Sequence, residues 1–105
     1  MRHLVGVLHG PVINFTSELE TGMDRVAEEC GFTVVNRAFH QFEPFGVTGV
    51  LVLAESHFSA HTYPEKNLTY IDVFCCSPHF NPTLCAAAIE RKFGGHLDWS
   101  VINRE

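Results

Sequence analysis

Six stretches of the chain carry apolar and polar residues in a pattern typical of strands, and two others carry them at helical spacing. Alternation with a period of two, or a short apolar run rich in β-branched residues, indicates a strand, whereas apolar residues every three or four positions indicate an amphipathic helix. The pattern predicts strands at residues 3–9, 32–42, 47–54, 57–63, 69–76 and 96–103, and helices at residues 17–30 and 81–92.

Both helices have recognisable ends. The first has an apolar stripe made by Leu19, Met23, Val26 and Ala27. Ser17 with Glu20 is a candidate capping box at its start, and Gly31 is a typical stop. The second helix has Pro82 at its first position and ends before Gly94, which is the expected placement of proline and glycine.

The order of these elements, β-α-β-β-β-β-α-β, predicts an α+β fold. Residues 1–105 contain no repeat, linker or low-complexity segment, so we expect a single domain. A two-layer α/β sandwich, with a mostly antiparallel sheet and both helices on one face, accounts for the pattern. The other face of the sheet would then lack a cover, which predicts a dimer.

Composition narrows the class of protein. With 105 residues and 46% hydrophobic content, the chain is long enough for one modest core without disulfides. A net charge of −5 with only seven Lys and Arg argues against nucleic-acid binding, which needs clustered positive charge. We find no apolar run near ~18 residues and no signal peptide, so we expect no membrane association and a cytoplasmic protein. The four cysteines, Cys30, Cys75, Cys76 and Cys85, are then expected to be free thiols.

Strand parity places polar residues in two rows, because side chains on a strand alternate between faces. If residues 57–65 are extended, one face carries His57, Ser59, His61, Tyr63 and Glu65. On the neighbouring predicted strand, one face carries Tyr70, Asp72, Phe74 and Cys76. Two strands thus each present a row of side chains suited to chemistry.

The end of the apolar run 47–54 carries the most distinctive chemistry. Ser56 directly follows the carboxylate residue Glu55 and stands five positions before His61. A serine in that place, with a histidine as its base, has the makings of an intramolecular nucleophile that attacks its own backbone.

This stretch and its flanks resemble the prokaryotic S-adenosylmethionine decarboxylase family, whose members cleave themselves before a serine. The resemblance extends over most of the chain, through residues 2–4, 39–50, 55–57, 61–65 and 72–76. It implies self-cleavage between Glu55 and Ser56 into a β chain, residues 1–55, and an α chain, residues 56–105. The family also implies a homodimer with active sites between the protomers.

The resemblance assigns a role to each processing residue. Ser56 would attack the carbonyl of Glu55 to give an ester, and His61 would remove the Ser56 α-proton so that the ester splits. The new N-terminus would become a pyruvoyl group derived from Ser56. A hydroxyl eight residues earlier, usually serine in the family and here Thr48, would help hold the processing intermediate, and its extra methyl is expected to slow the reaction.

Catalytic and substrate roles follow from the same resemblance. The pyruvoyl ketone would form a Schiff base with the substrate amine, and Cys76 would return a proton to the substrate carbon after decarboxylation. S-adenosylmethionine, in polyamine synthesis, is the implied substrate. Phe42 would stack on adenine, Tyr63 would supply a second aromatic ring, and Glu65 would bind ribose hydroxyls.

We weighed three alternatives, of which two stay open. Lys66-Asn67-Leu68 departs from the family pattern beside the substrate pocket, and relatives with the same cofactor decarboxylate arginine or ornithine. An unprocessed, non-catalytic paralogue acting as a partner subunit is the second alternative. The third is a metal site at His57, His61 and Glu65, which we reject because four residues of a strand span ~13 Å. We therefore expect no metal.

Overall fold

The computed structural model describes residues 1–105. Its elements follow the predicted order, with one short 3-10 helix added between the fourth and fifth strands. They are β1 (Arg2–His9), α1 (Thr16–Cys30), β2 (Val34–Gln41), β3 (Val47–Leu53), β4 (Ser56–Tyr63), η1 (Pro64–Lys66), β5 (Leu68–Cys75), α2 (Pro82–Phe93) and β6 (His96–Asn103).

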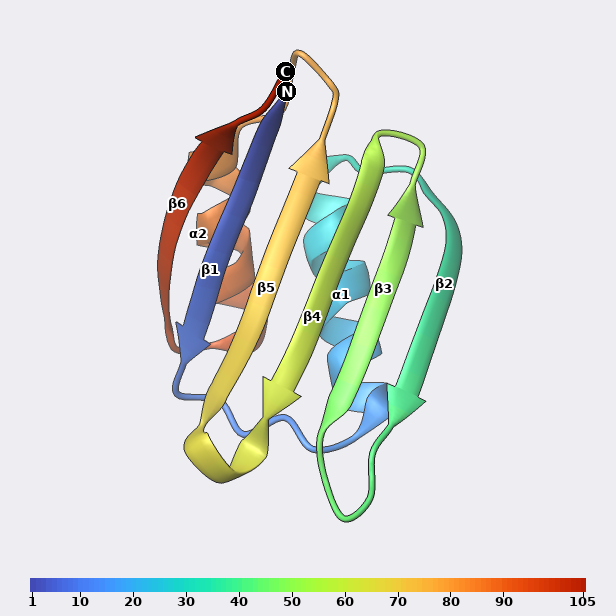
Figure 1. Cartoon of the computed structure of the whole chain (residues 1–105), viewed down its shortest axis with the longest axis vertical. Helices are drawn as coiled ribbons and strands as arrows, with labels where there is room; N and C mark the ends of the chain where they lie inside the picture. The colour runs from blue at the N-terminus through green and yellow to red at the C-terminus, as the bar shows by residue number, and fades with distance from the viewer.

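All six strands form one sheet in the order β2-β3-β4-β5-β1-β6. Every neighbouring pair is antiparallel. Figure 1 shows both helices on the same side of this sheet, with the other side uncovered. The predicted α+β fold, a two-layer sandwich with two helices on one face, is therefore confirmed. Neither helix has the length and apolar character needed to cross a membrane.

The core lies between the sheet and the helices. Alternate strand residues point into it, among them Leu4, Leu8, Leu51, Phe58 and Val73, and the helices contribute Leu19, Met23, Val26 and Ile89. Each fully buried side chain of this kind stabilises the fold by about 1.5–3 kcal/mol. The two helices also touch, because Gly22 of α1 leaves room for the ring of Phe93; a Cβ at Gly22 would lie 2.1 Å from that ring.

Several predicted element ends were wrong. The first helix begins at Thr16, and Glu18, not Glu20, accepts a hydrogen bond from the N–H of Phe15 at 3.1 Å, which replaces the predicted Ser17 cap. Glu20 instead forms an ion pair with Arg37 of β2. Pro64 ends β4 in the turn η1, so Glu65 does not continue the polar row of that strand.

The uncovered face of the sheet carries the predicted polar rows. Phe58, Ala60 and Thr62 of β4 are buried toward the helices, so His57, Ser59 and His61 face the other way. Large apolar side chains on this face are solvent-exposed, including Val52 at 42%, Tyr70 at 46% and Ile102 at 48%. We refer to this surface as the open face.

Candidate active site on the open face of the sheet

The turn between β3 and β4 contains the predicted cleavage point. Ala54 and Glu55 form a two-residue turn, with Leu53 and Ser56 paired on either side of it. Ser56 has a φ of 142°, a value that a residue with a side chain rarely adopts. Such a conformation costs of order 1–3 kcal/mol, so the backbone is strained at the bond where cleavage is expected.

Hydrogen bonds from neighbouring segments hold this turn. The N–H of Thr33 donates to the Glu55 carboxylate at 3.1 Å, and the N–H of Ala54 donates to the carbonyl of Thr33 at 2.9 Å. The N–H of Cys76 donates to the carbonyl oxygen of Glu55 at 2.8 Å. This carbonyl is the one that Ser56 would attack, so the Cys76 amide is placed where negative charge would develop.

Cys76 thus lies beside the Glu55–Ser56 bond, just after the last residue of β5. Its side chain is exposed, whereas Cys75 and Cys85 are buried. Burial raises the pKa of the Cys75 thiol, which therefore stays protonated and faces the core. Of the two adjacent cysteines, only Cys76 is accessible to a substrate. We call Glu55, Ser56 and Cys76 the cleavage end of the site.

His61 lies further along β4, opposite Thr48 of β3. The Thr48 hydroxyl and His61 Nδ1 are hydrogen-bonded, and both side chains are half-buried. Ring centroids of Tyr63 and Phe42 lie 4.8 Å and 5.8 Å from that of His61. We call Thr48, His61, Phe42 and Tyr63 the base end of the site.

The two ends are far apart within one chain. Ser56 and His61 are separated by five residues of a continuous strand. At the rise of an extended strand this is about 16 Å, far beyond hydrogen-bond reach. The expectation that Ser56 has its own base on the same strand therefore fails on distance.

The predicted substrate residues lie at the base end, with one exception. Phe42 begins the loop after β2, where its N–H donates to the carbonyl of Gly46 at 2.8 Å and its ring is 41% exposed. Tyr63 ends β4 and is 39% exposed. Glu65, in η1, is exposed and makes none of the ring contacts that join the others. The chain thus offers two aromatic rings beside the predicted base.

Two further aromatic rings lie beside these, and sequence reasoning did not place Tyr70 at the site. The ring of Tyr70 lies 5.7 Å from that of Tyr63, and the ring of His40 lies 4.6 Å from that of Phe42. Tyr70 was on the predicted polar row of its strand, but only the pairing of β4 with β5, which sets Tyr70 opposite His61, brings it to the site. The pairing of β4 with β5 could not be predicted from the pattern of residues along the chain.

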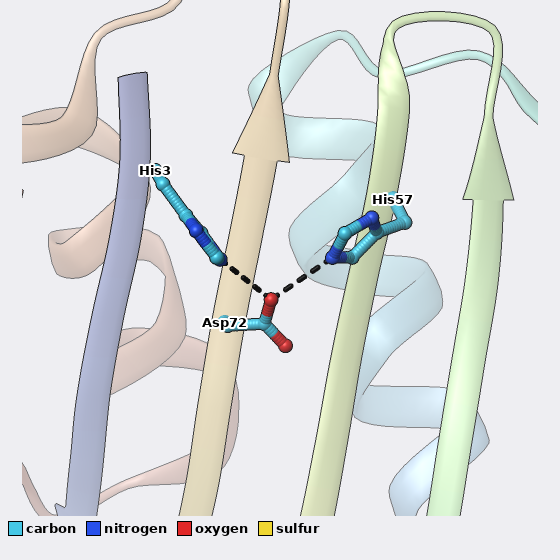
Figure 2. A group of neighbouring side chains, drawn as sticks. All are labelled: His3, His57 and Asp72. Atoms are coloured by element: carbon cyan, nitrogen blue, oxygen red, sulfur yellow. Dashed lines mark hydrogen bonds and ion pairs between the residues drawn. The ribbon is translucent and has the colours of Figure 1, made fainter. Parts of the chain in front are cut away.

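A third group on the open face was not predicted as a unit. His3 Nε2 and His57 Nε2 lie 2.7 Å and 2.9 Å from the same oxygen of Asp72, as Figure 2 shows. Burial raises the pKa of the Asp72 carboxyl, but hydrogen bonds from Ser59, His3 and His57 outweigh it and hold the pKa below its ordinary value. Asp72 is therefore an anion at neutral pH.

Comparisons with known proteins show which family the chain resembles. The model of the S-adenosylmethionine decarboxylase family matches residues 3–105. A curated relative from Symbiobacterium thermophilum, named S-adenosylmethionine decarboxylase proenzyme, is 42% identical over 85 residues, covering 81% of this chain and 64% of the relative. A relative of the same name from Acetivibrio thermocellus is 36% identical over 107 residues, covering 98% of this chain and 86% of the relative.

A solved structure shares the fold. The crystal structure of the adenosylmethionine decarboxylase from Aquifex aeolicus superposes with a TM-score of 0.88 at 27% sequence identity. The match covers 98% of this chain and 88% of that one. The chain spans just under two-thirds of the Symbiobacterium relative and a larger share of the other two proteins.

Proposed function

The chain belongs to the S-adenosylmethionine decarboxylase family, and from this premise we propose that it is a self-processing, pyruvoyl-dependent lyase that decarboxylates S-adenosylmethionine for polyamine synthesis. One observation carries the proposal: Ser56 has a strained φ of 142° at a turn where the Cys76 N–H contacts the Glu55 carbonyl. The proposed nucleophile and a hydrogen-bond donor for the developing oxyanion thus lie at the expected bond.

Processing begins with the chain's own atoms. Ser56 Oγ attacks the Glu55 carbonyl carbon, and the Cys76 N–H stabilises the oxygen that becomes negative. Breaking the Glu55–Ser56 C–N bond frees the Ser56 nitrogen as an amine and leaves an ester. The same step releases Ser56 from its strained conformation. A base then removes the Ser56 α-proton, and the electrons expel the Glu55 carboxylate. The resulting dehydroalanine tautomerises and hydrolyses, with loss of ammonia, to a pyruvoyl group on the chain that begins at position 56.

The base that completes this reaction comes from a second copy of the chain. His61 and Thr48 are hydrogen-bonded to each other but lie about 16 Å along the sheet from Ser56 of their own chain. Two open faces packed against each other would bring the base end of one protomer to the cleavage end of the other. Such a dimer would bury the exposed apolar side chains of this face, which would stabilise it.

Within that composite site, Thr48 keeps His61 in one orientation. For His61 to act as a base through Nε2, the neutral imidazole carries its proton on Nδ1, which donates to the Thr48 hydroxyl and leaves Nε2 free to accept a proton. Such orientation of a base by a neighbouring side chain is a general requirement of proton transfer.

The residues fit the implied cofactor, because Ser56 is the residue from which it forms and Cys76 is beside it. The pyruvoyl group, once formed, supplies a ketone for the substrate amine and an electron sink for decarboxylation. The Cys76 thiol, exposed next to position 56, holds the proton that returns to the substrate carbon.

Phe42 and Tyr63 supply the aromatic surfaces for S-adenosylmethionine. An aromatic face binds adenine by stacking and also attracts a sulfonium cation, by about 0.5–2 kcal/mol. Glu65 is free to bind ribose hydroxyls from the adjoining turn η1. Arginine and ornithine carry no ring for Phe42 and Tyr63 to stack on, and for this reason we favour S-adenosylmethionine.

Two measurements, made one after the other, test the proposal. Intact mass under reducing, denaturing conditions should show two fragments that divide between Glu55 and Ser56, the second with a pyruvoyl end. Release of labelled carbon dioxide should then occur from S-adenosylmethionine and not from arginine or ornithine. A single uncut chain would indicate a non-catalytic partner subunit, and turnover of arginine or ornithine alone would replace the substrate.

A further inference from the structure

We propose that His3, His57 and Asp72 form a binding site for a divalent transition-metal ion of the zinc class. Their three ligand atoms, two Nε2 nitrogens and one carboxylate oxygen, lie within 4.8 Å of one another. Two imidazoles and a carboxylate that leave further positions open are a ligand set that such ions commonly take. The site differs from the one rejected at the sequence level, because its ligands come from three strands.

Sheet pairing brings these ligands together. On β1 and β4, His3 and His57 are each paired with Phe74 of β5, one from either side. Asp72 lies two residues earlier on β5, on the same face, so its carboxylate reaches between the two rings (Figure 2). Because three hydrogen-bonded strands fix the backbone, the ligands are preorganised without any loop.

The distances suit an ion after a small adjustment. In a tetrahedral zinc site with bonds of about 2.0–2.1 Å, neighbouring ligand atoms are about 3.3 Å apart. The Nε2–Oδ2 separations are 2.7 Å for His3 and 2.9 Å for His57. An ion would therefore require each of these separations to widen by about half an ångström, and the two Nε2 atoms, which lie within 4.8 Å of each other, to stand about 3.3 Å apart.

The surroundings of the ligands support the site. Ser59 donates a hydrogen bond to the other oxygen of Asp72, Oδ1, and so leaves Oδ2 for the ion. Partners of this kind orient ligands in known metal sites. Asp72 also lines a hollow of about 590 Å³ on the open face, together with Val5 and Tyr70.

Arg104 is the one group that opposes an ion here. Its guanidinium lies 3.3 Å from His3 Nδ1, which must act as the acceptor, so the Nε2 of His3 carries the proton in the metal-free protein. An ion would displace that proton, and Arg104 would have to move away. Arg104 is exposed beyond the end of β6, and its guanidinium also lies 5.0 Å from the centre of the Phe74 ring, a contact that this movement would break.

Cobalt and zinc titrations of the full chain test the site. After removal of metals with a chelator, Co²⁺ binding is followed by visible absorption, and Zn²⁺ by calorimetry and by the rise in melting temperature. We expect one ion per chain. His57→Gln and Asp72→Asn should each weaken binding on the order of 100-fold or more, and Ser59→Ala about 10-fold, the range for residues that orient a ligand.

His96→Gln is the matched control. His96 also lies beside a carboxylate, with its Nε2 2.9 Å from Asp98, but it is exposed and outside the cluster. The same titrations of Ser56→Ala should give wild-type binding, so a failure of self-cleavage does not affect the result. Binding that survives Asp72→Asn, binding lost in His96→Gln, or no Zn²⁺-dependent rise in melting temperature of the wild-type chain would overturn the site.

Discussion

The cleavage end and the base end of the open face are built in different ways. At the cleavage end, backbone groups hold a strained turn, and the Cys76 thiol is exposed beside it. At the base end, the contacts are between side chains: Thr48 is hydrogen-bonded to His61, and aromatic rings pack around the imidazole. In the proposed function, one end supplies the reacting bond and the other supplies a base and a binding surface.

The comparison indicates that neither end is a complete site by itself. The cleavage end has the proposed nucleophile and oxyanion donor but no base within reach, and the base end lacks the bond that is expected to break. Both lie on the face that the helices leave uncovered. The proposed composite site of two chains would join the missing parts, and each prediction below tests one end against the other.

The largest effect is expected from Ser56→Ala at the cleavage end. The variant lacks the oxygen that attacks Glu55, so both self-cleavage and formation of the carbonyl cofactor should be abolished. Intact mass and trapping of the carbonyl with borohydride in the presence of an amine are the measurements. Cleavage at this bond in the variant would show that Ser56 is not the nucleophile.

Cys76→Ala should separate processing from turnover. The backbone N–H that contacts Glu55 remains, so the chain should still cut itself. Loss of the proton donor should lower kcat by about 10²–10⁴-fold, the range for general acid catalysis. The rates of cleavage and of carbon dioxide release are measured side by side. Unimpaired turnover would contradict the assignment of the thiol.

Phe42→Ala tests the binding surface of the base end. Stacking of a base on an aromatic ring contributes about 1–3 kcal/mol, so KM should rise roughly 10-fold or more with little change in cleavage. Phe45→Ala is a matched control, because Phe45 is equally exposed, at 41%, and lies three residues away. Equal effects of the two substitutions on KM would argue against stacking on Phe42.

The smallest effect is expected at Thr48. Thr48→Val keeps the shape but loses the hydrogen bond to His61, which is worth about 0.5–1.5 kcal/mol, so cleavage should slow by a few-fold to about 10-fold. Thr48→Ser keeps the hydroxyl and should cleave at least as fast as the native chain. A time course of cleavage measures both variants. Faster cleavage of the valine variant would show that the hydroxyl is not needed.

Much of the fold followed from local pattern. Period-two alternation gave the strands, and its parity placed His57, Ser59 and His61 on one face, as observed. The errors fell where capping decides an element's end. Glu18 reaches back to the backbone of Phe15, a choice that the nearby serine and threonine residues did not reveal. Such contacts depend on a few backbone angles and not on hydrophobic spacing.

The roles of the candidate site residues stay predictions, and their arrangement could not be read from the sequence. Resemblance to a family selected Ser56, His61 and Cys76, yet spacing along the chain suggested that Ser56 and His61 act together. A strand of known rise separates them, and only its geometry shows this. The cluster of His3, His57 and Asp72 depends on pairing between β1, β4 and β5, and the pairing of distant strands is not encoded in any local pattern.

The most direct test of the composite site is complementation between Ser56→Ala and His61→Ala chains. Each variant alone should stay uncut. When the two are co-expressed with different tags, a mixed dimer contains one site with Ser56 from the His61→Ala chain and His61 from the Ser56→Ala chain. We predict that the His61→Ala chain is then cut between Glu55 and Ser56, as seen by intact mass, while the Ser56→Ala chain is not. If isolated mixed dimers show no cleavage of either chain, the base does not come from the partner and the account is contradicted.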